Sequence, residues 1–128
     1  MNSYDPEQSP DSNTWLSLSE DDRIHLAMVT HESSNTELLS QSLSLHASIH
    51  VVVENQLALN TEFIPETLVA LMKLGMSRHN AVHAIGAVIL EELQSAARGG
   101  ETFTSAQYRR KFDDLIKASG GSSASMLA

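Results

Sequence analysis

The 128-residue sequence contains no cysteine. Disulfide bonds, thiolate zinc sites and cysteine nucleophiles are therefore excluded, because each of them needs a thiol. Any transition metal bound by this chain must use nitrogen and oxygen ligands.

Basic residues are also scarce, with eight Lys and Arg against sixteen Asp and Glu, which gives a formal net charge of −8. A surface with this balance repels the phosphate backbone of DNA or RNA. We therefore expect no nucleic acid partner.

Long apolar runs and a targeting signal are missing as well. No apolar run approaches the roughly 20 residues that a membrane-spanning helix needs, so we expect no membrane partner. The polar, acidic start MNSYDPEQSPDSN lacks the basic and apolar regions of a secretory signal. We expect a cytoplasmic location.

The length fits one domain, since domains of about 100 to 150 residues are the commonest. Residues 1–15 are rich in Ser, Asp and Pro without an apolar period, and residues 119–128 are rich in Gly and Ser. Both compositions are typical of disorder. The sequence thus predicts a disordered segment over residues 1–15, a helical domain over 16–118 and a flexible tail over 119–128.

Helix start and stop signals recur through the central part, with capping-box spacings, a proline at a first-turn position and glycines where helices end. We predict helices over residues 19–30, 40–59 and 78–98, a short helix between Pro65 and Gly75, and a last helix that Thr104 and Gln107 open. The predicted fold is all-α, a compact bundle of about five helices in which the two long helices pack antiparallel.

Two histidine pairs lie on these long helices, His46 with His50 and His79 with His83. A spacing of four places each pair on one helix face, and both pairs fall on apolar stripes that should face the core. An unsatisfied donor or acceptor on a buried imidazole costs about 1 to 3 kcal/mol, so four such rings favour a shared metal ion.

The other candidate ligand is Glu54, two turns after His46, either as a fifth ligand or as the acceptor that orients a histidine. The remaining histidines, His25 and His31, are six residues apart and do not share a face, so we interpret them as surface residues. The metal should be a divalent transition ion such as zinc, nickel or iron.

The segments LHASIHVVVENQLAL, SRHNAVHAIGAVILEEL and RGGETFTSAQYRRKFDDL resemble an uncharacterised bacterial family classed as a domain of unknown function. Such proteins pair a histidine motif ending in Glu-Asn-Gln or Glu-Gln with a motif like Arg-His-Glu-x-x-His. The resemblance implies an all-helical, metal-binding domain and brings no established activity. Asn80 departs from the pattern, because Glu is common there.

Three functions follow from these residues. The first is a metal-binding protein, structural or sensory, with one ion on the two histidine pairs. The second is a redox or hydrolytic metalloenzyme with an open coordination site, although Asn80 stands where an H-E-x-x-H hydrolase has its general base. The third is a metal-free structural or interaction module, and a homodimer formed through a helix face is compatible with each of them.

Overall fold

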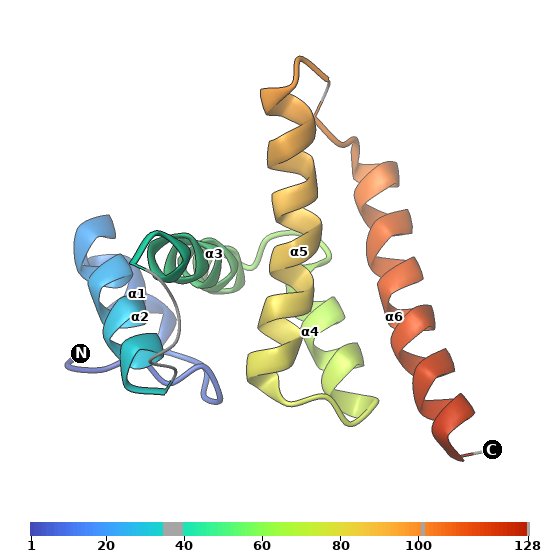
Figure 1. Ribbon diagram of the computed structural model, residues 1–128, viewed down its shortest axis with the longest axis horizontal. Helices are drawn as coiled ribbons and strands as arrows, with labels where there is room; N and C mark the ends of the chain where they lie inside the picture. Colours follow the sequence, from blue (N-terminus) through green and yellow to red (C-terminus); the bar gives the residue numbers. More distant parts are fainter. Residues whose placement is uncertain (35–39, 101, 128) are drawn as a thin grey trace. The chain divides into compact units, whose positions relative to one another are not determined.

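The computed structural model describes residues 1–34, 40–100 and 102–127. Six α-helices and no strand occur among these residues (Figure 1), so the predicted all-α class is confirmed. The chain divides into two compact units, Met1–Thr61 and Glu62–Ala128, rather than the one helical domain that the sequence predicts. We call them unit 1 and unit 2.

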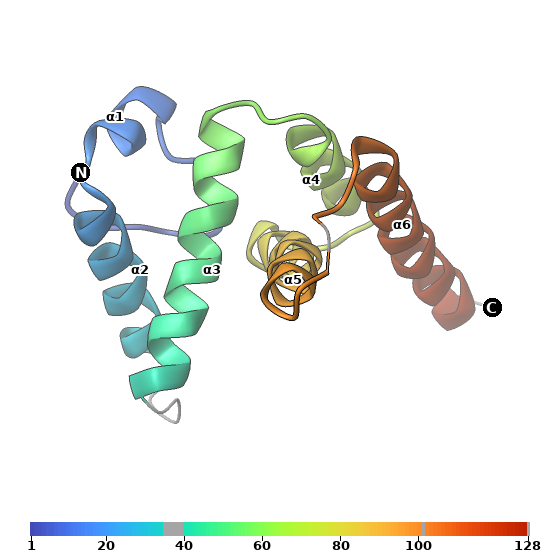
Figure 2. The ribbon, with the colours of Figure 1, turned by 90° about the horizontal axis from the view of Figure 1, so that it is seen from above.

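Unit 1 contains α1 (Ser12–Ser17), α2 (Glu20–Ser34) and α3 (Ser40–Ala58). The helices α2 and α3 lie side by side and run in opposite directions (Figure 2). Short polar side chains start two of the helices: Asp11 accepts a hydrogen bond from the Thr14 backbone N–H at 3.0 Å, and Ser19 accepts one from that of Asp22 at 3.1 Å. These bonds satisfy N–H groups that have no partner within a helix.

The segment over residues 1–15, for which the sequence predicts disorder, contributes two aromatic side chains to the core of unit 1. Tyr4 is 2% exposed and Trp15, in α1, is 1% exposed. Both pack with Ala27 of α2 and with Ala47 and Val51 of α3. Two aromatic side chains, which bury a large area each, thus dock a segment whose composition is otherwise polar.

Unit 2 contains α4 (Ile64–Lys73), α5 (Arg78–Ala97) and α6 (Ser105–Leu127). The helices α5 and α6 run in opposite directions (Figure 1). The helix α6 reaches Leu127, beyond residue 118 where the sequence analysis ended the domain, so its backbone is helical where a flexible tail was predicted.

The helix boundaries that the sequence predicts in unit 2 are confirmed by the residues that cap and end these helices. Gly75 follows α4 with a φ of 98°, a conformation that glycine adopts at little cost. Ser77 caps α5 by accepting a hydrogen bond from the Asn80 backbone N–H at 3.1 Å. Thr104 and Gln107 exchange the two side-chain-to-backbone bonds of a capping box, at 2.8 and 3.2 Å.

The buried apolar side chains of unit 2 come from all three helices, as expected for a helix bundle. They are Ile64, Leu68 and Leu71 of α4, Ala81, Val82, Ile85, Val88 and Ile89 of α5, and Phe112 of α6. Leu93 of α5 is apolar as well, yet its side chain is 55% exposed.

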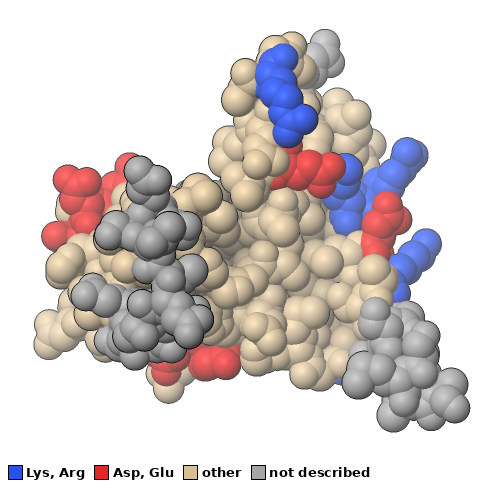
Figure 3. Space-filling model, viewed as in Figure 1, with Lys and Arg blue, Asp and Glu red and all other residues tan. Residues whose placement is uncertain are grey.

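Charge is unevenly divided between the two units. Nine acidic residues and one basic residue lie in unit 1, whereas unit 2 has seven of each, so the formal net charge of −8 belongs to unit 1. Figure 3 shows Lys and Arg side chains over α5 and α6. Within the described ranges no helix is long and apolar enough to cross a membrane.

Candidate metal centre

Two histidine pairs are the candidate metal ligands among the described residues, His46 with His50 and His79 with His83. These are the four histidines that the sequence predicts. His46 and His50 belong to α3 in unit 1, and His79 and His83 belong to α5 in unit 2. Each pair is therefore a half-site with its own surroundings.

The unit 1 pair has one buried and one half-buried ring. His50 is fully buried, and its ring centroid lies 5.2 Å from that of His46 at an interplanar angle of 38°. This is the geometry expected of side chains one helical turn apart. The sequence prediction that the pair lies on the inner face of α3 is confirmed for His50.

A buried polar cluster surrounds His50. The Tyr4 hydroxyl oxygen lies 3.0 Å from Nδ1 of His50 and donates a hydrogen bond of 2.5 Å to Oε2 of Glu54. Glu54 is 2% exposed. A carboxylate and an imidazole are costly to bury unless hydrogen bonds compensate them, so Tyr4 gives both groups part of their compensation.

Glu54 was predicted as a fifth ligand or as an orienting acceptor. In the structure, Oε2 of Glu54 accepts a hydrogen bond from the Tyr4 hydroxyl, and this hydroxyl also contacts His50. Glu54 thus reaches His50 through Tyr4, which the sequence analysis missed because Tyr4 lies in a segment predicted to be disordered. A lone aromatic residue in a polar stretch, upstream of the Asp11 cap and Trp15, was the available signal.

The Tyr4 side chain is itself anchored inside unit 1. Its ring centroid lies 5.5 Å from that of Trp15 and 5.8 Å from that of His50, which it meets edge-on at 74°. Thr30 of α2 donates a hydrogen bond to the Tyr4 backbone carbonyl. Contacts with α1, α2 and α3 therefore determine the position of the Tyr4 hydroxyl.

The unit 2 pair is more open. The rings of His79 and His83 are half-buried, and their centroids are 4.4 Å apart in an edge-to-face arrangement at 74°. Both lie in the first two turns of α5, directly after the Ser77 cap. Capping fixes where α5 begins, and the spacing of four places His79 and His83 on one face of this helix.

Asn80, between these two histidines, is exposed, and its backbone N–H is the donor to the Ser77 cap. An amide cannot act as the general base that a carboxylate supplies to a metal-bound water. The structure therefore offers no H-E-x-x-H geometry at α5. His25, predicted to be a surface residue, is exposed, and the side chain of His31 lies outside the described residues.

Two further carboxylates of α5 are engaged with α6. Glu92 accepts hydrogen bonds from the Tyr108 hydroxyl and from the Phe103 backbone N–H, and Glu91 pairs with Lys111 at 2.6 Å. Burial raises the pKa of Tyr108 well above its ordinary value, and its hydrogen bond to Glu92 and the charge of Glu92 raise it further. These carboxylates join α5 to α6.

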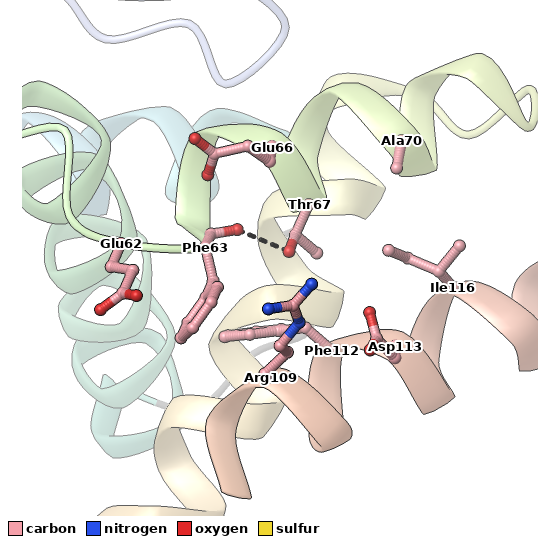
Figure 4. Close-up of a pocket in the computed structure, with 9 residues that line it drawn as sticks. All are labelled: Glu62, Phe63, Glu66, Thr67, Ala70, Arg109, Phe112, Asp113 and Ile116. Carbon is pink, nitrogen blue, oxygen red and sulfur yellow. Dashed lines mark hydrogen bonds between the residues drawn. The ribbon is translucent and has the colours of Figure 1, made fainter. Parts of the chain in front are cut away.

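Unit 2 also has a groove of about 480 Å³ between α4 and α6 (Figure 4). Phe63 and Phe112 supply aromatic surface, and the charged lining consists of Arg109 with the carboxylates of Glu62, Glu66 and Asp113. No histidine lines it. Because imidazole is the stronger transition-metal ligand in a cysteine-free chain, the histidine pairs are the better candidate site.

Searches of protein-family models, curated proteins and solved structures give no match for this chain. The resemblance to a family of unknown function stays a prediction.

Proposed function

We propose that this protein binds one divalent transition metal ion through both histidine pairs, His46 with His50 and His79 with His83. The observation that carries the proposal is the geometry of each pair, whose two ring centroids lie 5.2 Å apart in His46 and His50 and 4.4 Å apart in His79 and His83. One pair comes from each unit. A shared ion would join unit 1 to unit 2, which suits a structural or a sensory role.

The ligand chemistry supports a borderline metal. Neutral imidazoles are preferred by zinc, nickel and iron, and four of them can complete a tetrahedral zinc shell. The formal charge of −8 in unit 1 also favours cations near that unit over phosphate-bearing ligands. Zinc is therefore the first ion to test, with nickel and iron after it.

Catalysis has less support than binding. Asn80 replaces the carboxylate that a hydrolytic zinc site requires, and Glu91 and Glu92 make contacts with α6. We further propose that the chain belongs with the helical family of unknown function whose motifs it resembles. The cytoplasmic location and the homodimer remain predictions from the sequence.

The test is a calorimetric titration of Zn²⁺ into protein that carries no histidine tag and has been stripped with a chelator. Wild type should bind zinc saturably, and His50→Ala or His83→Ala should weaken binding at least tenfold. His25→Ala is the matched control, because His25 is exposed on α2 and outside both pairs.

Zinc should also stabilise the fold, by about 2.7 kcal/mol when its free concentration is 100 times the dissociation constant. The proposal is wrong if wild type shows no saturable zinc, nickel or iron binding. It is equally wrong if His25→Ala weakens binding as much as the paired histidine variants do.

A further inference from the structure

Tyr4 is the residue of unit 1 whose contacts bear most directly on the chemistry of His50. Its hydroxyl has one proton and lies between two buried groups, 2.5 Å from Oε2 of Glu54 and 3.0 Å from Nδ1 of His50. A hydroxyl can donate to only one of them at a time and must accept from the other. Which group receives the proton decides the protonation pattern of the His50 ring.

The lengths of the two bonds identify the acceptor. A distance of 2.5 Å is typical of an O–H donor on a carboxylate, the stronger, charge-assisted type of hydrogen bond. The separation of 3.0 Å from Nδ1 is that of an ordinary N–H···O bond. The Tyr4 hydroxyl therefore donates its hydrogen bond to Glu54, and the Tyr4 oxygen accepts a hydrogen bond from Nδ1–H of His50.

We infer that Tyr4, backed by Glu54, is a positioning residue that holds His50 in the tautomer protonated on Nδ1, with the electron pair on Nε2. A metal binds the nitrogen that carries the electron pair, and the hydrogen bond on the other nitrogen fixes the ring orientation. The tautomer rests on the geometry of unit 1 alone, whereas its effect on metal affinity rests on the function proposed above.

The proposal gives the first residues of the chain a role at the site. Tyr4 is fixed by Trp15 on one side and by the Thr30 hydroxyl bond to its backbone on the other. Since Tyr4 is 2% exposed and Glu54 is equally buried, water competes little for these bonds. The orientation of His50 is therefore set before any metal arrives.

Nitrogen-15 NMR of the imidazole rings in the metal-free full-length chain, at a pH where His50 is neutral, reads the tautomer directly. We expect His50 to be protonated on Nδ1 in wild type and to move toward protonation on Nε2 in Tyr4→Phe, which keeps the ring and removes the hydroxyl. Tyr108→Phe is the matched control, because Tyr108 is the other tyrosine of the chain and lies in unit 2.

Substitution of Glu54 separates positioning from packing. In Glu54→Ala the Tyr4 proton loses its acceptor and should turn to Nδ1 of His50, which reverses the tautomer. Glu54→Gln retains a carbonyl acceptor and should keep the wild-type tautomer, and it also serves if Glu54→Ala fails to fold. If Glu54 only supported packing, the His50 tautomer would not reverse in Glu54→Ala while staying unchanged in Glu54→Gln.

Zinc titration is the second readout, and Tyr4→Phe should weaken zinc binding about 10- to 100-fold, the usual effect of removing such a partner. The positioning role is overturned if His50 is protonated on Nε2 in wild type or if Tyr4→Phe leaves its tautomer unchanged. If instead the tautomer behaves as expected but no variant binds zinc, the metal function fails and the positioning of His50 stands.

Discussion

Replacing Asn55 by alanine should destabilise unit 1 selectively. Oδ1 of Asn55 accepts two hydrogen bonds, from the Trp15 indole at 2.9 Å and from Nη1 of Arg23 at 3.0 Å. Through them, one side chain of α3 is bonded to both α1 and α2.

The magnitude follows from what each donor loses. The Trp15 indole N–H is left without this acceptor in the core, at a cost of about 1 to 3 kcal/mol. Arg23 loses less, about 1 kcal/mol, because its other terminal nitrogen still donates to the carbonyls of Leu16 and Leu18 at 2.9 and 2.8 Å. The higher helix propensity of alanine offsets about 0.5 kcal/mol of this loss of stability. We expect a net loss of about 2 to 3 kcal/mol.

Urea unfolding followed by tryptophan fluorescence measures this loss of stability in unit 1. Trp15 is the single tryptophan of the chain and belongs to unit 1, so its signal follows that unit. Asn13→Ala is the control, because Asn13 is exposed in α1, and it should change the free energy of unfolding by less than about 0.5 kcal/mol. An Asn55→Ala effect as small as that of the control would refute the reasoning.

Two further predictions concern unit 2. Because the folded-state pKa of Tyr108 is raised, unfolding releases its proton once the pH exceeds about 10, the ordinary tyrosine pKa. The free energy of unfolding should therefore fall above that pH, and it should fall less steeply in Tyr108→Phe. Alkaline unfolding followed by circular dichroism measures both. Gly75→Ala should cost about 1 kcal/mol in thermal unfolding although no atom would lie within 4 Å of the added Cβ, because φ is 98° there. Gly75→Asn should cost less, and equal losses for both variants would contradict the backbone explanation.

Local signals predicted much of the fold. Gly75 and the pair Thr104 and Gln107 act where the sequence predicts them, and Ser77 caps the helix predicted to begin at residue 78. Caps and turns can be predicted because they depend on residues a few positions apart. The run from Val51 to Val53 lies within the helix predicted over residues 40–59, despite its strand propensity.

Contacts between residues far apart in the sequence account for the features that local patterns do not predict. Tyr4 reaches His50 and Glu54, and Trp15 reaches Asn55, across about 40 to 50 residues, and no periodicity encodes such a pairing. Composition alone therefore indicated disorder for a segment that two aromatic side chains fix in the core. The exposure of Leu93 has a related reason, since an apolar stripe on a helix does not specify which of its residues a neighbouring helix covers.

For the candidate metal centre too, local patterns predicted some residues and missed others. Spacing and periodicity identified all four rings, because each pair lies on one helix. They did not identify Tyr4, whose contact with His50 depends on the packing of unit 1. The proposed convergence of the two pairs on one ion depends on both units, so the decisive test must remove one pair at a time.

Zinc stoichiometry in two double variants tests this convergence most directly. One variant replaces His46 and His50 by alanine, and the other replaces His79 and His83. The shared site predicts one tightly bound zinc per wild-type chain and none in either double variant. Two zinc ions per wild-type chain, with one retained by each double variant, would contradict it.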